Sequence, residues 1–154
     1  MRKQILLGII IGIVVLIVII LFASITTVPT GYVGVKTRFG EVQNDVIQEG
    51  LNTKAPFIEK IVKIDCRTKK SELESNSASK DLQDVNLKVA INYNVNKSNA
   101  NKLYQEVGVD YEKIIVQPAI LESIKAVTAQ YTAEELITNR QEVSNLMKDK
   151  LKEK

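Results

Sequence analysis

Two kinds of side chain in this sequence could act as nucleophiles: the single cysteine, Cys66, and a group of serines that lie close to lysines. A thiol or hydroxyl becomes a catalytic nucleophile only when a base is held within hydrogen-bonding reach. The chain contains no histidine, so Cys66 lacks the base that most often activates a thiol. It also shares its parity with the apolar residues of an expected strand, and we interpret it as a small core hydrophobe.

The serines offer a second possibility, a Ser–Lys pair in which the amine serves as the base. Flexible polar sequence brings such residues near one another by chance, so a Ser–Lys hydrolase is the least favoured hypothesis. The residues concerned are Ser71, Ser75, Ser77 and Ser79 beside Lys69, Lys70 and Lys80.

Paired carboxylates occur at Glu72 and Glu74 and again at Glu134 and Glu135. Neither pair lies in a metal-binding loop or a glycosidase-like context, and the second pair belongs to the start of a helix. The sequence contains no phosphate-binding loop and no GxGxxG motif. We therefore predict no catalytic residue, no metal ligand and no cofactor, and a protein that is not an enzyme.

The charge balance argues against nucleic acid as a partner. The chain has 21 basic and 18 acidic residues, and no tryptophan. Arg2 and Lys3 supply two of the basic residues, which leaves 19 basic against 18 acidic in the remainder. A nucleic-acid-binding domain needs a basic patch or stripe, and none is evident.

Residues 5–25 form the longest apolar segment: 21 residues without a charge, of which 18 are Ala, Val, Ile, Leu or Phe. As a helix this segment would extend about 31 Å, close to the thickness of a bilayer's hydrocarbon core. Backbone polar groups in lipid must bond internally. We therefore predict one transmembrane helix within an N-terminal anchor over residues 1–25, with membrane lipid as a partner.

Two other interpretations of the segment stay open. A cleavable signal peptide has a shorter apolar region that ends in small residues, whereas Leu21–Ala23 is a weak cleavage site. An interfacial helix needs a polar face, which the segment lacks. Arg2 and Lys3 precede the segment, and Lys36 is the first basic residue after it. The positive-inside rule then predicts a single-pass protein of the cell membrane with a cytoplasmic N-terminus and an external domain.

Alternation of apolar and polar residues predicts strands in the next part of the chain. Tyr32–Arg38 is one, and a half-buried strand is expected between Ile58 and Arg67. Residues 69–81 are polar and fit either a strand edge or a loop. The clearest pattern extends from Val85 to Val95 and predicts a strand with one wet face, which is typical of an antiparallel sheet.

Helical spacing follows. Residues 100–107 predict a helix that ends at Gly108, and Asp110 is a candidate cap of a second helix. Pro118 either begins a further helix or kinks this one.

The spacing of Thr132 and Glu135 predicts a capping box, which Thr138 and Gln141 repeat. A narrow apolar stripe between charged flanks then predicts the start of a coiled coil. Because strands precede helices, the fold class is α+β: a transmembrane helix, a small antiparallel-sheet domain with packed helices, and the start of a C-terminal coiled-coil helix. The stripe consists of Val143, Leu146, Met147 and Leu151.

Several motifs resemble the stomatin/prohibitin/flotillin (SPFH, or band 7) superfamily, and within it bacterial prohibitin homologues most of all. Each motif is short, but their order, spacing and position after the apolar segment make the resemblance specific. Together they are spread over roughly residues 28–150, which is nearly the whole polar domain. They are RFG at 38–40, GLNTKAPFIEK at 50–60, ASKDLQ at 78–83, LYQEVG at 103–108, QPA at 117–119 and AVTAQYTAEELITNR at 126–140.

The resemblance implies an SPFH domain over residues 28–138, followed over 139–154 by the start of a truncated C-terminal helix. It also implies lateral assembly into rings or cages, organisation of membrane microdomains and, for several members, restraint of membrane-bound AAA proteases of the FtsH kind. It carries over no catalytic residue. Relatives continue well past the last helix, whereas this chain stops within it at Lys154.

Two hypotheses follow. The first is a non-enzymatic, membrane-anchored, prohibitin-like scaffold that self-associates laterally as a homo-oligomer, or as a hetero-oligomer with relatives, and regulates membrane proteins such as an AAA protease. The alternative is a monovalent partner-binding or dominant-negative short form that does not assemble.

Overall fold

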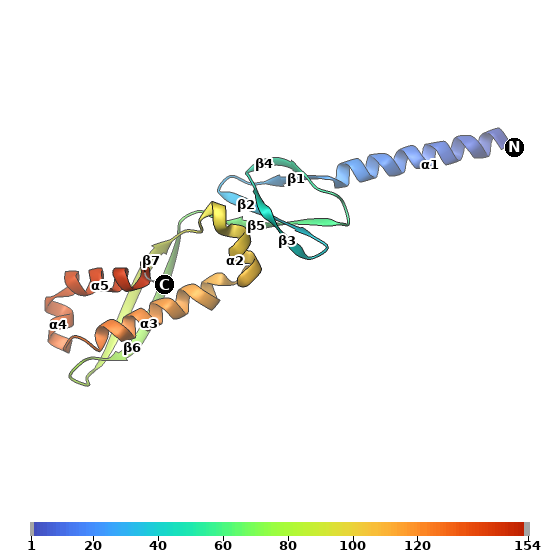
Figure 1. Cartoon of the computed structure of the whole chain (residues 1–154). Coiled ribbons are helices and arrows are strands. Elements are labelled where there is room, and N and C mark those ends of the chain that lie inside the picture. The colour runs from blue at the N-terminus through green and yellow to red at the C-terminus, as the bar shows by residue number, and fades with distance from the viewer. Residues whose placement is uncertain (1, 153–154) are drawn as a thin grey trace. The chain divides into compact units, whose positions relative to one another are not determined.

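A computed structural model describes residues 2–152 of the protein, with side chains for residues 7–152. The chain divides into two compact units, each built from two segments. Unit 1 comprises residues 1–67 and 95–106, and unit 2 comprises residues 68–94 and 107–154. Figure 1 follows the elements in order from α1 to α5. Antiparallel sheets and helices together confirm the predicted α+β class.

The first element, α1 (Arg2–Ala23), is a helix of 22 residues. Its described side chains are exposed, with exposed fractions of 59% at Leu7 and 75% at Phe22. Among the residues that the structure describes, no helix combines the length and the apolar character that a membrane crossing requires. The predicted single-pass topology is therefore not supported by the structure. Arg2 and Lys3, which predicted its orientation, lie outside the described side chains.

Apart from α1, unit 1 contains two antiparallel sheets, a 3-10 turn and a short helix. One sheet has the strand order β3–β2–β5, and the other pairs β1 with β4. β2 and β5 confirm the two strands predicted here, whereas the sequence pattern did not predict β1, β3 or β4. The bounds are β1 (Ile25–Val28), β2 (Tyr32–Arg38), β3 (Glu41–Ile47), β4 (Gly50–Thr53), β5 (Glu59–Asp65), the 3-10 turn η1 (Lys97–Asn99) and α2 (Ala100–Glu106).

The core of unit 1 surrounds β2, which is covered on both faces. Val33 and Val35 are fully buried on one face, and Gly34 is buried between them on the other. A Cβ at Gly34 would lie 2.8 Å from Cγ2 of Ile61 and 3.1 Å from Cβ of Ile47. That separation is shorter than van der Waals contact, so the close packing of this face requires glycine.

Unit 2 is built on a long hairpin of β6 (Lys69–Ala78) and β7 (Asp84–Tyr93). Its antiparallel register extends from Lys69 opposite Tyr93 to Ala78 opposite Asp84. β7 confirms the predicted antiparallel strand, and β6 shows that the polar segment is a strand rather than a loop. Within the described residues, the second edge of β7 pairs with no strand.

Helices cover this hairpin on one side, where α3 lies along β6 and α5 packs against α3 (Figure 1). Pro118 lies in the first turn of α3, where a missing N–H leaves no intrahelical bond unmade, so it begins this helix after a π-helical turn. Ile120, Ile124 and Val127 of α3 are at most 1% exposed and form the centre of the core. The bounds are η2 (Glu112–Val116), α3 (Gln117–Thr128), α4 (Ala133–Thr138) and α5 (Arg140–Lys152).

The predicted capping box at the start of α4 is confirmed. The Glu135 N–H donates to Thr132 Oγ1 at 3.2 Å, and the Thr132 N–H donates to the Glu135 carboxylate at 2.8 Å. The predicted repeat at Thr138 is wrong. Thr138 is still helical, and its hydroxyl donates back to the Glu134 carbonyl at 3.0 Å instead of capping α5.

The part of the chain that the structure describes contains no coiled coil. Val143 of α5 is 6% exposed and belongs to a cluster with Val127 and Leu136, against which Leu146 and Met147 pack. Much of the stripe that predicted a partner helix is therefore used within unit 2 itself.

Candidate functional site

Cys66 lies directly after β5 and belongs to the core of unit 1. It is 7% exposed, and its thiol donates to the Ile64 carbonyl at 3.7 Å. Burial in the core keeps the thiol out of reach of substrates. The interpretation of Cys66 as a core hydrophobe is therefore confirmed.

Ser79 is engaged with a carboxylate rather than with a lysine amine. Its hydroxyl donates to Asp81 Oδ1 at 2.6 Å and accepts the Gln83 N–H at 3.1 Å. The bond from Ser79, followed by one from the Ala133 N–H, lowers the pKa of Asp81. These contacts close the turn between β6 and β7.

Asp81 also joins this turn to the start of α4. Its Oδ1 accepts the Ala133 N–H at 3.1 Å, and the backbone N–H of Lys80 donates to the Tyr131 carbonyl at 2.8 Å. Two of the motifs singled out above, at residues 78–83 and 126–140, therefore meet in space. Their role here is to connect the hairpin to the helices.

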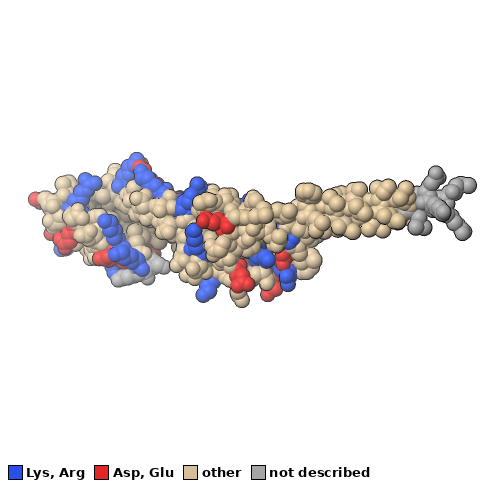
Figure 2. All heavy atoms as spheres, turned by 90° about the horizontal axis from the view of Figure 1, so that it is seen from above, with Lys and Arg blue, Asp and Glu red and all other residues tan. Residues whose placement is uncertain are grey.

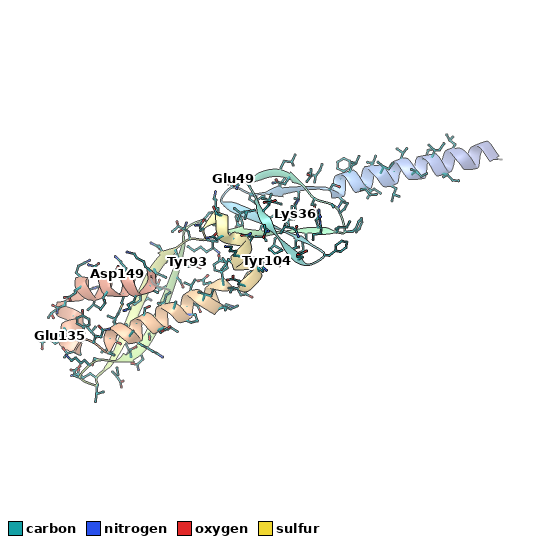
Figure 3. The ribbon with its side chains drawn as sticks, viewed as in Figure 1. Lys36, Glu49, Tyr93, Tyr104, Glu135 and Asp149 are labelled. Atoms are coloured by element: carbon teal, nitrogen blue, oxygen red, sulfur yellow. The ribbon has the colours of Figure 1, made fainter. Side chains whose placement is uncertain are left out.

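The carboxylates of Glu72 and Glu74 lie in a ladder of ion pairs on the exposed face of the hairpin. Glu72 binds Lys70 at 2.6 Å and Lys88 at 2.8 Å, and Lys88 also reaches Glu74 at 3.3 Å. The hydrogen bonds from Lys70 and then Lys88 lower the pKa of Glu72 to about 2. Glu135, labelled in Figure 3, serves the capping box. No group of His, Cys, Asp and Glu that could hold a metal ion occurs within residues 7–152.

Unit 1 contains a carboxylate with several partners at one end of its larger sheet. Only 5% of the Glu59 side chain is exposed, and it pairs with Arg38 at 2.8 Å and with Lys36 at 3.7 Å (Lys36 is labelled in Figure 3). Its second oxygen accepts the Ala55 N–H at 2.9 Å. The Ala55 bond, followed by the Arg38 bond, lowers the pKa of Glu59. Glu59 thereby fastens the turn before β5 to the end of β2.

Two exposed apolar turns lie together at this end of the sheet. Phe39 is 82% exposed, Phe57 96% and Ile58 42%. The Phe39 N–H donates to the Ile58 carbonyl at 3.0 Å, which holds the two turns side by side. Both phenylalanines have positive φ, at 51° and 69°. We call these three residues the apolar tip. It unites the motifs at 38–40 and 50–60, whose meeting the sequence did not predict.

A second apolar surface covers α1. Residues 7–23 include no charged side chain, and the described part of α1 in Figure 2 shows none of the blue or red that marks charges elsewhere. Large exposed apolar surfaces are uncommon on isolated soluble proteins and mark contacts with lipid or with other proteins.

Unit 2 contains a third apolar surface, a groove between β7 and α5. It consists of two adjoining cavities of about 430 and 610 Å³, whose linings share Ala90, Ile91, Lys148 and Leu151. Residues of β7 form one wall, and Val143, Met147 and Leu151 contribute to the other. Ile115, Val116 and Ala119, from η2 and the start of α3, also line the larger cavity. Sequence reasoning missed this groove because it forms only when α5 folds back beside a strand about fifty residues earlier in the chain.

Comparison with known proteins places the chain in a family. Residues 26–154 match the SPFH domain / Band 7 family. The chain is 33% identical to Prohibitin-2 of Mus musculus over 133 residues, which is 85% of this chain and 44% of that protein. It is 34% identical to Prohibitin-1 of Schizosaccharomyces pombe over 133 residues, 86% of this chain and 47% of that protein. Prohibitin 1 of Mus musculus is 34% identical over 117 residues, 76% of this chain and 43% of that protein.

The chain thus spans just under half the length of these curated relatives. The family match begins three residues after α1 ends and extends through both units. This match agrees with the resemblance inferred from the order of the motifs. The chain belongs to the SPFH domain / Band 7 family.

Proposed function

We propose that this chain is a non-enzymatic, prohibitin-like scaffold that is anchored to a membrane and associates laterally with further copies or with relatives. The observation that carries the proposal is α1, whose apolar side chains from Leu7 to Phe22 are exposed and belong to no buried core. Lipid is the environment that such a surface fits best, because it covers the apolar side chains while the helix satisfies its own backbone.

The proposal retains the predicted arrangement of the chain. An anchor over residues 1–25 crosses the cell membrane once with a cytoplasmic N-terminus, the SPFH domain occupies residues 28–138, and a terminal helix follows over 139–154. Family membership supports a membrane-associated domain of this kind, and the order of basic residues supports the orientation.

The apolar tip supports a second contact with lipid beside the anchor. The Lys54 N–H donates at 2.8 Å to the carbonyl of Ser24, the residue that directly follows α1. Phe57 lies only three residues beyond Lys54, and the exposed Lys60 follows. Aromatic rings flanked by basic side chains are well suited to the interface between acyl chains and anionic headgroups.

As a scaffold the protein would organise membrane microdomains and regulate other membrane proteins, among them an AAA protease of the FtsH kind. The resemblance to prohibitin homologues supports this role. Cys66 is buried, the Ser79 hydroxyl bonds to Asp81, Glu135 caps α4 and Glu72 lies in surface ion pairs, which supports a protein that performs no chemistry of its own.

Extraction of the full chain from membranes tests the anchor. We expect it to remain with the membrane at alkaline pH and to float with liposomes. A Val14→Lys, Ile17→Lys variant should be extracted, because two charges in the apolar helix oppose insertion. Leu82→Lys, at a residue 87% exposed in the hairpin turn, is the matched control and should stay bound. Extraction of the unaltered chain would overturn the anchor, and protease accessibility in intact cells tests its orientation.

Crosslinking in native membranes, followed by a size measurement in nanodiscs, tests lateral association. The scaffold hypothesis predicts species larger than a dimer, with relatives or a protease among the co-purifying proteins. A protein that stays strictly monomeric at its natural level would contradict it.

One observation favours the alternative of a monovalent or dominant-negative short form. The apolar stripe of α5 packs partly into unit 2, with Val143 at 6% exposure, and is to that extent unavailable to a neighbouring helix. This alternative predicts that the chain captures a full-length relative or a protease in a pull-down without associating with itself.

A further inference from the structure

The groove of unit 2 lies along an open strand edge, and its charged lining has a single sign. We propose that it binds an extended, acidic segment of a partner protein, which adds as a third strand to the free edge of β7. The inference does not rest on the scaffold proposal, because it concerns a different surface and requires neither a membrane nor self-association.

The first support is the way in which β7 lines the groove. Residues 87–91 line one cavity and residues 90–93 line the other. Successive side chains of a strand point to opposite faces, so a lining of consecutive residues places the groove along the edge of the strand. Within the described residues this edge pairs with no other strand. Its backbone N–H and C=O groups are therefore available to a ligand.

The second support is the apolar wall opposite that edge. Val143, Met147 and Leu151 are spaced by four residues, so they form one row along α5. The seven residues of β7 that line the groove extend about 23 Å, which sets the length of a matching extended segment at about seven residues. Alternate apolar side chains of such a segment would face the row on α5.

The third support is charge. Every charged side chain in the lining of the two cavities is basic: Lys88, Arg140, Lys148 and Lys152. Arg140 and Lys148 are exposed, whereas Lys88 is shared with Glu72 and Glu74 on the hairpin. Cations at the rim of an apolar groove favour carboxylates on the ligand and repel basic segments. The ligand is therefore an extended segment that combines apolar side chains with a net negative charge.

The probe that tests this is a seven-residue peptide, capped at both ends, in which valine alternates with glutamate. Its binding to the full chain in neutral detergent micelles is measured by fluorescence anisotropy. We expect saturable binding that weakens on the order of tenfold in an Arg140→Glu, Lys148→Glu variant, since attraction becomes repulsion. Lys125→Glu, a change of the same charge on an exposed residue of α3 outside the groove, should bind as the unaltered chain does.

The neutralised variant Arg140→Gln, Lys148→Gln should bind the peptide with an affinity between those of the unaltered chain and the charge-reversed variant. Circular dichroism checks that each variant is folded. A peptide with lysine in place of glutamate should bind at least about tenfold more weakly. Unchanged affinity in the charge-reversed variant, or equal binding of the lysine peptide, would overturn the proposal.

Strand addition is tested by backbone methylation. Only alternate N–H groups of an added strand face β7, so a peptide N-methylated at one parity should lose binding and one methylated at the other parity should retain it. Equal binding of both peptides would show that the ligand is not a strand. A chain that dimerises without peptide, and becomes monomeric on Lys148→Glu, would assign the groove to a second copy and overturn the proposal.

Discussion

Arg38 and Glu59 stand opposite one another at the last paired position of β2 and β5, and the Arg38 guanidinium donates two hydrogen bonds to Glu59 Oε1, at 2.8 and 3.3 Å. The other carboxylate oxygen accepts the Ala55 N–H. One side chain therefore fixes both the end of a strand and the turn that carries Phe57, and the apolar tip depends on this arrangement.

Glu59→Gln should loosen that turn, because glutamine keeps a single acceptor oxygen, which cannot serve both the Arg38 guanidinium and the Ala55 N–H. We expect faster hydrogen exchange at the Ala55 amide and a lower melting temperature. Glu41→Gln, a matched change at an exposed residue, should alter neither. If the Ala55 amide of the Glu59 variant still exchanged slowly, the turn would be stable without the Glu59 carboxylate.

Phe57→Cys offers a direct probe of the apolar tip, because Cys66 is 7% exposed and is protected from labelling. A polarity-sensitive dye at position 57 should brighten and shift to the blue on vesicles that contain anionic lipid, as the tip enters the interface. The same dye at Leu82→Cys should keep the spectrum it has in water. Identical responses at the two positions would count against a lipid contact at the tip.

Gly34→Ala should destabilise unit 1 by about 1–3 kcal/mol, the range expected for overpacking a tight core. The added methyl would lie 2.8 Å from Cγ2 of Ile61. Urea unfolding measures the effect, and the Gly34→Ala, Ile61→Ala double variant supplies the control. With the Ile61 side chain shortened, Gly34→Ala should cost less stability than it does in the unaltered chain. Strictly additive losses of stability from the two changes would contradict the proposed clash.

Thr132→Ala should cost about 1 kcal/mol, the usual effect of losing an N-cap side chain. Thr138→Ala should stay within about 0.5 kcal/mol of the unaltered protein, because its hydroxyl returns to its own helix. Thermal unfolding compares the two. Equal losses of stability in the two variants would indicate that Thr138 also caps a helix, contrary to the structure.

The ion pairs of Glu72 with Lys70 and Lys88 should make the stability of the protein depend on pH in the acidic range. The pKa of Glu72 falls from its ordinary 4.5 to about 2 in the folded protein. The stabilisation is therefore complete above about pH 4.5 and is lost as the pH falls toward 2. Glu72→Gln, and also Lys70→Met, should flatten the pH dependence of urea unfolding over this interval. If the pH dependence of urea unfolding stayed the same in both variants, these ion pairs would contribute no net stability.

The sequence predicted the elements whose signals are local. β2 and β7 carry a regular alternation, and the capping box depends on two residues three positions apart, so each could be identified without the rest of the fold. β3 could not, because EVQNDVI has polar residues on both faces and becomes a strand by pairing with β2. The prediction at Thr138 was wrong for the opposite reason. Its spacing to Gln141 fits a cap, but Thr138 is the last residue of α4, which Thr132 caps.

The candidate surfaces were predicted less well than the elements. The apolar helix was evident from composition alone. The apolar tip needed two turns separated by eighteen residues to meet, and the groove needed α5 to fold back beside β7. Neither event has a short-range signal, although both turns of the tip lie within motifs that predicted the family.

The division into two interleaved units has a consequence for synthesis. The sheets of unit 1 leave the ribosome first, but Ala100, which is fully buried, and Asn101, which donates to the Asn44 carbonyl of β3 at 2.8 Å, arrive only after residues 68–94. Until then the early sheets lack their covering helix, while the hairpin of unit 2 emerges without α3. Neither unit can therefore complete its fold until part of the other has been synthesised. A ribosome that stalls between residues 68 and 99 would leave both units incomplete.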